Sequence, residues 1–205
     1  IHLDIDPTEI GKNYPTAVGA VCDAKAGLND LYDALIDHNG SEGIDRPEYR
    51  AEIARLREEW KQMLTGRWTG KLSLSQVLHR SREVLPREAI AIASAGHPQI
   101  QAFQEFLSYE PRTWLSPGGY STMGYEIAGG LGIKMARPGE EVVVMVGDGS
   151  YLMLNSELAT SVMLGLKLTV VLLDNRGFGC INRLQMATGG ANFNNLLKDT
   201  VHEVM

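Results

Sequence analysis

Two long apolar segments in the second half of the sequence constrain the fold most. Residues 141–146 (Glu-Val-Val-Val-Met-Val) and 167–173 (Lys-Leu-Thr-Val-Val-Leu-Leu) are almost continuous runs of aliphatic side chains. Such runs are typical of strands buried on both faces of a parallel sheet. Between them, Ser156–Leu164 has a helical pattern, and Gly165 stands where a helix commonly ends. The spacing therefore predicts a right-handed βαβ unit.

The same alternation extends back to Ser73. We expect a helix from Ser73 to about Pro86, a buried strand over residues 88–93, a helix near residues 99–107, and a helix over Tyr125–Met135. The last of these carries three glycines, which predicts close packing against a neighbour. Strands that alternate with helices indicate an α/β fold, in which a parallel sheet has helices on both faces.

Two further segments precede this region. Residues 1–40 contain a strand-like start and a helix for which Asp23 is the expected N-cap, and they read as the last strand and helix of an α/β domain whose earlier part is missing. Residues 41–72 form a connector with one amphipathic helix, which we expect to pack across a domain surface. The third segment, residues 73–205, is then a domain of its own. Because the chain starts without Met inside a strand pattern and ends abruptly, we expect a piece of a longer protein, truncated at its C-terminus.

Charge and hydropathy exclude several classes of partner. Nineteen Lys and Arg residues against twenty-five Asp and Glu give a net charge of −6, which argues against a nucleic-acid surface. No apolar run is long enough to cross a bilayer, and no signal peptide opens the chain. The two cysteines, Cys22 and Cys180, are far apart and are expected to be reduced thiols. We therefore expect a cytoplasmic protein that acts on a small molecule.

Two polar turns follow the apolar strands. Gly147-Asp148-Gly149 comes directly after the first, and Asp174-Asn175 comes directly after the second. The carboxyl ends of neighbouring parallel strands meet at the edge where α/β sheets bind ligands, so we expect these turns to lie side by side. Glycines at 147, 149 and 177 allow the backbone to approach a ligand closely. Either turn alone would be an ordinary loop, whereas the pair is much more specific.

The residues of these turns have the chemistry of a magnesium diphosphate site. Asp148 offers an anionic oxygen, Asn175 an amide oxygen, and Gly177 a backbone carbonyl. Mg²⁺ usually takes only one or two carboxylates and completes its octahedron with phosphate oxygens and water. We therefore predict a diphosphate bridged by Mg²⁺, with the Ser150 backbone N–H and hydroxyl near the phosphates.

With these motifs the sequence resembles thiamine-diphosphate-dependent enzymes of the acetohydroxyacid synthase and pyruvate oxidase type. The resemblance covers essentially the whole chain. Its most specific part runs from Gly147-Asp148-Gly149 to Asn175, and includes Glu157-Leu158-Ala159-Thr160 on the helix between them. It implies that residues 1–40 are the end of a Rossmann-like central α/β domain and that residues 73–205 have the thiamine-diphosphate-binding fold. It also implies thiamine diphosphate with Mg²⁺ as cofactors.

The resemblance also assigns further site residues. The segment Gly119–Gly124 is similar to the family's loop beside the aminopyrimidine ring, which implies cofactor contacts for Gly119, Thr122 and Met123. Gly96–Ile100 falls where the family places an active-site loop. Ile100 would then be the apolar wedge that bends the cofactor. For His97, a proton relay and a surface residue at a helix start remain alternative interpretations.

One family residue lies outside the chain. In the family, the glutamate that protonates the aminopyrimidine comes from an N-terminal pyrimidine-binding domain, usually of a neighbouring subunit. The resemblance therefore implies self-association with that domain of another copy. By itself, this chain should be unable to activate the cofactor.

Within the family, the stretches around Glu126, Tyr151 and Phe178 look most like the branch that hydrolyses a trihydroxycyclohexane-1,2-dione to 5-deoxy-glucuronate in inositol catabolism. This implies cleavage of a C–C bond in a cyclic 1,2-diketone. An acetolactate synthase-like carboligase or decarboxylase is the alternative, and a non-catalytic cofactor-binding subunit is a further one. Intact metal ligands argue against the last, and a Pro7 turn after the first strand argues against a dinucleotide-binding protein.

The residues after the second polar turn have two possible roles. Asn182, Arg183 and Gln185 could contact substrate hydroxyls or could simply be solvated. The stretch 187–195 is rich in Gly and Asn, a composition that fits a mobile lid.

Overall fold

The computed structural model describes residues 1–41, 43–66 and 70–197, which fall into two compact units, Ile1–Glu59 and Trp60–Met205. In the first unit, β1 (His2–Asp4) pairs in parallel with β2 (Gly19–Val21). Helix α1 (Ala24–Asn39) follows, and the Asp23 side chain accepts hydrogen bonds from the N–H groups of Lys25 and Ala26. The expected N-cap is therefore confirmed, whereas β2 was not predicted because three residues carry too little pattern.

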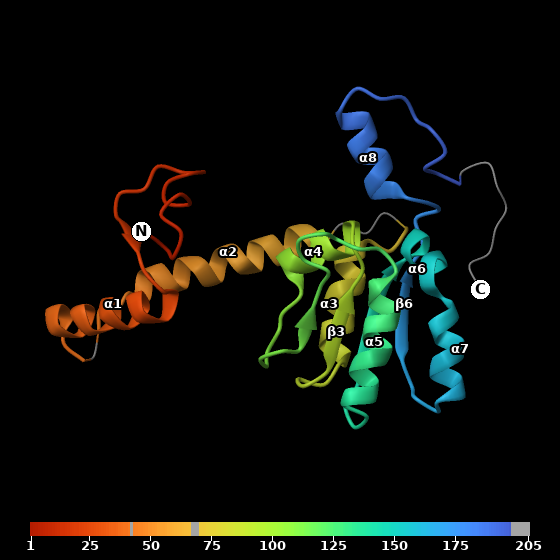
Figure 1. Ribbon diagram of the computed structural model, residues 1–205, viewed down its shortest axis with the longest axis horizontal. Helices are drawn as coiled ribbons and strands as arrows, with labels where there is room; N and C mark the ends of the chain where they lie inside the picture. Colours follow the sequence, from red (N-terminus) through yellow and green to blue (C-terminus); the bar gives the residue numbers. More distant parts are fainter. Residues whose placement is uncertain (42, 67–69, 198–205) are drawn as a thin grey trace. The chain divides into compact units, whose positions relative to one another are not determined.

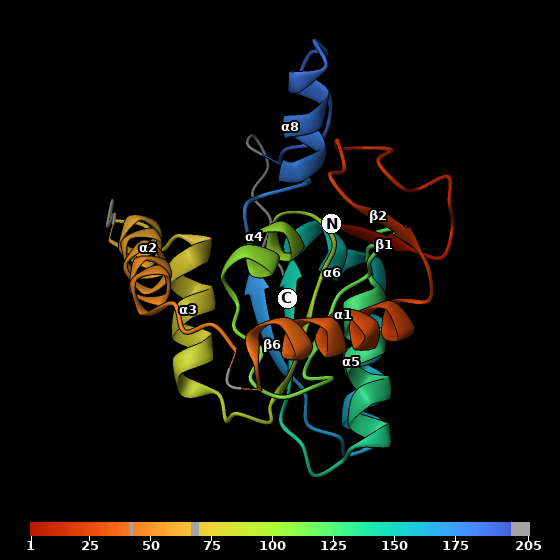
Figure 2. The ribbon, with the colours of Figure 1, turned by 90° about the vertical axis from the view of Figure 1, so that its left-hand side faces the viewer.

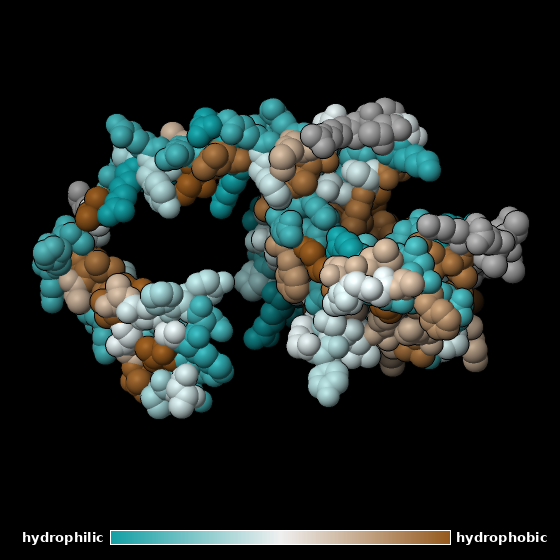
Figure 3. Space-filling view, turned by 90° about the horizontal axis from the view of Figure 1, so that it is seen from above, coloured by the Kyte–Doolittle hydropathy of each residue, from teal (hydrophilic) through white to brown (hydrophobic). Residues whose placement is uncertain are grey.

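Helix α2 (Pro47–Thr65) carries the predicted apolar stripe. Tyr49, Leu56, Trp60 and Met63 on this stripe are about half exposed, and brown apolar side chains stand among teal charged ones along α2 in Figure 3. In the part of the chain that the structure describes, no helix is both long enough and apolar enough to cross a membrane.

The second unit alternates helices and strands (Figure 1). Its elements are α3 (Leu74–Val84), β3 (Ile90–Ala93), α4 (His97–Glu105), β4 (Trp114–Leu115), α5 (Tyr125–Ala136), β5 (Val142–Gly147), α6 (Asp148–Leu154), α7 (Ser156–Met163), β6 (Thr169–Leu173) and α8 (Gly179–Ala187). Ser73 caps α3 by a capping box with Gln76, in which each residue's side chain bonds the other's backbone N–H. Gly165 after α7 has a φ of 64°, as expected for the residue that ends a helix.

The four strands of this unit form one parallel sheet in the order β4-β3-β5-β6. Because strand side chains alternate between faces, β5 supplies both layers of the core. Val143 and Met145 pack with Leu78 of α3 and Ala102 of α4. On the other face, Val144 and Val146 pack with residues of α5, α6 and α7, including Ile127, Tyr151 and Leu158. The predicted α/β class, with helices on both faces of a parallel sheet, is confirmed.

The close packing that was predicted from the three glycines of α5 is present at Gly130 but not at Gly132. A Cβ on Gly130 would lie 2.6 Å from Val144 Cγ2, so only glycine lets α5 approach β5 this closely. At Gly132 a Cβ would meet open space, and packing does not require glycine there.

Four details differ from the sequence-based expectation. Strand β6 was predicted to be buried on both faces, yet all its residues are only partly buried, because it is the edge strand of the described sheet. Helix α6 starts at Asp148 itself, where only a turn was expected, and the two-residue β4 was not predicted. Helix α4 starts at His97, about two residues earlier than expected.

Candidate functional site

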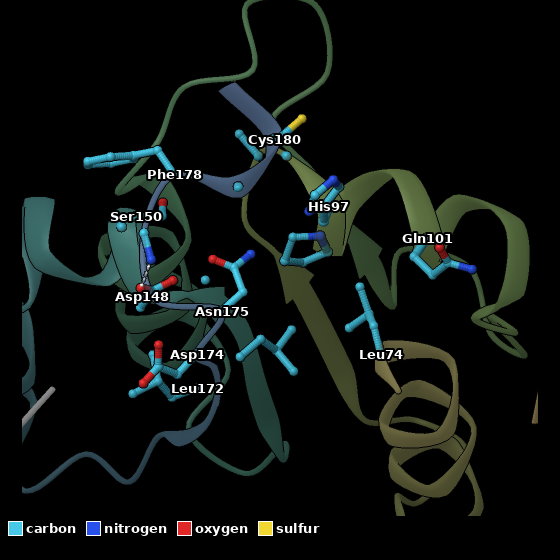
Figure 4. Close-up of a pocket in the computed structure, with 18 of the residues that line it drawn as sticks. Leu74, His97, Gln101, Asp148, Ser150, Leu172, Asp174, Asn175, Phe178 and Cys180 are labelled. Atoms are coloured by element: carbon cyan, nitrogen blue, oxygen red, sulfur yellow. Dashed lines mark hydrogen bonds between the residues drawn. The ribbon is translucent and has the colours of Figure 1, made fainter. Parts of the chain in front are cut away.

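The two polar turns meet at the carboxyl edge of the sheet. Strands β5 and β6 run side by side with Gly147 opposite Leu173, so Asp148 and Asn175 follow adjacent strand ends. Figure 4 shows their side chains next to each other at the centre of a pocket. Helix α8 stands above this edge in both Figure 1 and Figure 2. The juxtaposition that the βαβ pattern predicted is therefore present.

Asp148 is the most constrained residue of this edge. It is 1% exposed, and its Oδ2 accepts a hydrogen bond of 2.6 Å from the backbone N–H of Gly177. The other oxygen, Oδ1, is buried and has no hydrogen-bond partner among the described residues. A buried carboxylate oxygen without a partner is costly. A cation that contacts Oδ1 would remove that cost.

The loop after β6 is built to present backbone and amide oxygens. Asp174 Oδ1 accepts from the N–H of Arg176 over 2.8 Å, and Arg176 has a φ of 63°. Gly177 has a φ of 136°, a value that strongly favours glycine. Asn175 lies against Gly179, where a Cβ would come within 2.8 Å of its Nδ2. Glycine thus leaves room for the Asn175 amide to face the pocket.

A second segment holds this loop from outside. The N–H of Phe178 donates to the Asn195 carbonyl over 2.7 Å, and the N–H of Leu197 donates to the Arg176 carbonyl over 2.8 Å. Gly177 and Leu196 thereby form an antiparallel bridge, whose hydrogen bonds leave the Gly177 carbonyl free. We call residues 195–197 the strap. No pattern in the sequence indicated it, because a three-residue pairing carries no periodicity.

The side chain of Gln185, on α8, forms a hydrogen bond with the strap. The amide of Gln185 donates to the Ala191 carbonyl and accepts from Asn195 Nδ2. Gln185 is therefore engaged with the segment that follows α8, which leaves its suggested contact with a substrate hydroxyl without structural support. The stretch 187–195 is anchored at both of these points.

Ser150 links the Gly147-Asp148-Gly149 turn to α5. Its Oγ accepts a hydrogen bond of 2.7 Å from the N–H of Gly124 and lies 2.5 Å from Glu126 Oε1. Glu126 is fully buried, and its Oε2 has no hydrogen-bond partner in the described parts of the chain. Burial raises the pKa of Glu126 above its ordinary value, and the hydrogen bonds from Ser150 and from the backbone only oppose this effect.

These residues surround a pocket of about 700 Å³, a volume within the range of small-molecule sites. Eight of the residues proposed from the sequence line it: His97, Met123, Gly147, Asp148, Gly149, Ser150, Asn175 and Gly177. Gly119, Thr122 and Ile100 are not among its lining residues. From the loop before α5, the lining residues are Ser121 and Met123.

The two catalytic candidates, His97 and Ile100, both lie on α4, but only His97 lines the pocket. His97, Pro98 and Gln101 line the pocket, whereas Ile100 is 44% exposed on the same side of the helix as the exposed Phe103. Because α4 starts at His97, the 100° step of a helix turns Ile100 away from the pocket. Ile100 thus lies apart from the residues that it was predicted to join, and Met123 is the bulky apolar residue of the predicted set that reaches the pocket.

His97 stands at the rim in a setting that favours its neutral form. Its Nε2 is buried without a hydrogen-bond partner among the described residues. Burial lowers the pKa of His97, and the positive charge of Arg183 on α8 lowers it further. A neutral imidazole with an unoccupied nitrogen can accept or relay a proton.

Several lining residues were not proposed from the sequence. Leu72, Leu74 and Val77 form an apolar wall, and Phe178, just before α8, and Cys180, in the first turn of α8, line the pocket on the side of that helix. A Cβ on Gly149 would lie 2.6 Å from the Phe178 ring, so Gly149 is glycine because the ring packs on it. The run Gly177-Phe178-Gly179 hinted at such packing, but it did not show which surface the ring would cover.

The donor set fits a magnesium diphosphate. In the described ranges, no group of three or more His, Cys, Asp or Glu side chains is placed to hold a metal. Asp148 Oδ1, the Asn175 amide and the Gly177 carbonyl, which accepts no hydrogen bond from the described residues, would give a hard cation three oxygens at most. Mg²⁺ tolerates so few protein ligands when phosphate oxygens and water complete its octahedron.

Comparison with known proteins agrees with this geometry. Residues 94–203 match the family described as thiamine pyrophosphate enzyme, C-terminal TPP binding domain. The chain is 36% identical, over 93% of its length, to the 3D-(3,5/4)-trihydroxycyclohexane-1,2-dione hydrolases of strains of Bacillus cereus and Geobacillus thermodenitrificans. It is 37% identical, over 90% of its length, to the acetolactate synthase of Mycobacterium avium. The chain spans about a third of the length of these relatives, 33%, 33% and 30% respectively.

Proposed function

The chain belongs to the thiamine pyrophosphate enzyme family, whose C-terminal cofactor-binding domain it carries, and from this we propose that it holds thiamine diphosphate and Mg²⁺ for the cleavage of a C–C bond beside a ketone. The observation that supports the cofactor most directly is the buried Asp148 Oδ1, which lacks a partner among the described residues, beside the Asn175 amide. When bound, thiamine diphosphate supplies the nucleophilic carbon and the electron sink for this chemistry.

The residues of the chain bind and orient the cofactor. Asp148, Asn175 and the Gly177 carbonyl would hold Mg²⁺, which in turn would bridge the diphosphate. Gly147, Gly149 and Ser150 would receive the phosphates, since each lines the pocket beside Asp148. The hydrogen bond from Gly177 to Asp148 keeps the two metal-binding turns together before any ion arrives.

We assign the apolar wedge to Met123 in place of Ile100. Met123 lines the pocket together with Ser121, whereas Ile100 faces away from it. His97 would accept or relay a proton at its Nε2, which is buried and unpartnered in the described structure. Both assignments rest on the lining of the pocket and on the chemistry of the two side chains.

For the substrate, we propose a cyclic 1,2-diketone of the trihydroxycyclohexane-1,2-dione type. The support for this choice is the 36% identity to hydrolases of that name, of whose length the chain spans 33%. Glu126, which is buried beside Ser150, lies in one of the three stretches of sequence that resemble this branch. An acetolactate synthase activity is the alternative, because the chain is as similar to the acetolactate synthase of Mycobacterium avium, at 37% identity, as it is to these hydrolases.

A second copy of the protein would complete the site. We take the glutamate that protonates the aminopyrimidine to lie on an N-terminal pyrimidine-binding domain of another subunit, as the family resemblance implies. The pocket of about 700 Å³ at the sheet edge would receive the cofactor's diphosphate, and the partner's domain would receive its ring. We therefore propose a homo-oligomer, at least a dimer, with shared active sites.

Product analysis of the full-length protein decides between the two substrates. The protein, loaded with thiamine diphosphate and Mg²⁺, is incubated separately with the trihydroxycyclohexane-1,2-dione and with pyruvate. We expect a ring-opened deoxy-glucuronate from the dione and no acetolactate from pyruvate. Acetolactate as the main product would overturn the hydrolase proposal and support the synthase alternative.

A further inference from the structure

Glu126 is a buried acid that the proposed chemistry does not use. It lies in the first turn of α5, is 0% exposed, and does not line the pocket. The side chain that shares a hydrogen bond with it is Ser150, which does line the pocket. Glu126 is therefore one hydroxyl group away from the place where the phosphates would lie.

The Ser150 hydroxyl has two possible arrangements. A serine hydroxyl has one hydrogen to donate and two lone pairs to accept with. One lone pair already receives the N–H of Gly124. If Glu126 is ionised, the Ser150 hydrogen must point to Glu126, and the remaining lone pair faces the pocket. If Glu126 is protonated, it donates to the second lone pair, and the Ser150 hydrogen is free to face the pocket.

The surroundings of Glu126 favour the second arrangement. Its Oε2 is buried and has no hydrogen-bond partner among the described residues. A buried carboxylate with one unpaired oxygen is more costly than a neutral acid, which leaves only a carbonyl oxygen unpaired. The rise in the pKa of Glu126 caused by burial agrees with the neutral form.

We propose that Glu126 is a positioning residue that stays protonated and donates its proton in a hydrogen bond to Ser150 Oγ, so that the Ser150 hydroxyl donates to a phosphate oxygen of the bound diphosphate. The 2.5 Å separation of Glu126 Oε1 and Ser150 Oγ lies within the range of hydrogen bonds between two oxygens, and it does not define which of the two carries the hydrogen. This inference rests on the proposed function, because it takes the pocket to bind a diphosphate.

A set of variants separates the two arrangements. Thiamine diphosphate is titrated calorimetrically, at a fixed saturating Mg²⁺ concentration, into the full-length wild type, Ser150→Ala, Glu126→Gln and the double variant. Glutamine is neutral and can donate its N–H to Ser150 Oγ as the protonated acid would. We expect Glu126→Gln to change the affinity by less than about twofold, and Ser150→Ala to weaken it by about tenfold in both backgrounds.

Two results would overturn the proposal. Ser150→Ala without effect on affinity when Glu126 is present would mean that the hydroxyl points to an ionised carboxylate or away from the phosphates. A tenfold or larger loss in a folded Glu126→Gln protein would mean that the negative charge is required. Thermal unfolding and circular dichroism of each variant identify any change of fold.

Infrared spectroscopy gives a readout that needs no cofactor. The difference spectrum of wild type minus Glu126→Gln should contain the C=O stretch of a protonated carboxylic acid at neutral pH. A carboxylate band in its place would contradict the proposal. A wild type that shows the acid band but binds no thiamine diphosphate would instead contradict the proposed function, so the two failures are distinguishable.

Discussion

The backbone N–H of Gly177 donates a hydrogen bond of 2.6 Å to Asp148 Oδ2. This bond joins the turn after β5 to the loop after β6, and it leaves Asp148 Oδ1 without a partner among the described residues. One carboxylate oxygen is thus used to assemble the site, and the other remains for a ligand. Changes to either half of this pair should therefore weaken cofactor binding.

Replacement of Gly177 by Ala should disrupt the loop after β6. A Cβ at this position would lie 2.4 Å from the Asn195 carbonyl oxygen and 2.9 Å from Leu196 Cα, at a φ of 136°. Either the strap or the loop must move, so we expect Mg²⁺-dependent binding of thiamine diphosphate to weaken at least about tenfold. Calorimetry of the full-length variant measures this.

Gly165→Ala is the matched control for Gly177→Ala. It has the same positive sign of φ, 64°, but a Cβ there meets open space after α7. We expect a stability cost of about 1 kcal/mol and an unchanged cofactor affinity. Equal effects of the two variants on affinity would show that backbone strain, and not the contact with the strap, is responsible.

Truncation of Met123 should affect turnover more than truncation of Ile100. Met123 lines the pocket and Ile100 does not, so only Met123→Ala removes an apolar group that could orient the cofactor. We expect a loss of about tenfold or more in kcat for Met123→Ala and less than about twofold for Ile100→Ala. The reverse order in steady-state assays would restore the sequence-based assignment of the wedge to Ile100.

His97 should titrate below the ordinary histidine value. Burial is the larger cause and the charge of Arg183 the smaller, so Arg183→Gln should raise the pKa of His97 only part of the way back to 6.5. A histidine with a lowered folded-state pKa binds its proton more weakly when folded, so its contribution to stability is lost as the pH falls below 6.5. NMR titration of labelled histidines, with His97→Gln for assignment, tests this. A wild-type midpoint at or above 6.5 would contradict it.

The part of the site that lies on strand ends could be predicted from the sequence. The apolar runs that became β5 and β6 determine a parallel pair, and a parallel pair brings Asp148 and Asn175 to one edge. The predicted domain limits at residues 40 and 72 stay predictions. The two compact units divide at Glu59, inside α2.

The other parts of the site could not be predicted, because they depend on how particular segments pack against each other, and such packing produces no periodic pattern in the sequence. Ile100 was assigned to an active-site loop by resemblance, whereas the structure places it inside α4, where it does not line the pocket as His97 and Gln101 do. The strap pairs Leu196 with Gly177 over a very short segment. The contact between Ser150 and Glu126 joins two helices across the edge of the core, and a single sequence does not record such pairs.

The central claim is that Asp148 holds a divalent cation which binds the diphosphate. Its most direct test is calorimetric titration of thiamine diphosphate into full-length wild type and Asp148→Asn, each with Mg²⁺ and with the ion removed. Asparagine can still accept the hydrogen bond from Gly177 but lacks the charge. We predict that wild type binds only with Mg²⁺ and that Asp148→Asn binds at least about a hundredfold more weakly with it. Equal affinities of the two proteins, or wild-type binding that does not require the ion, would contradict the account.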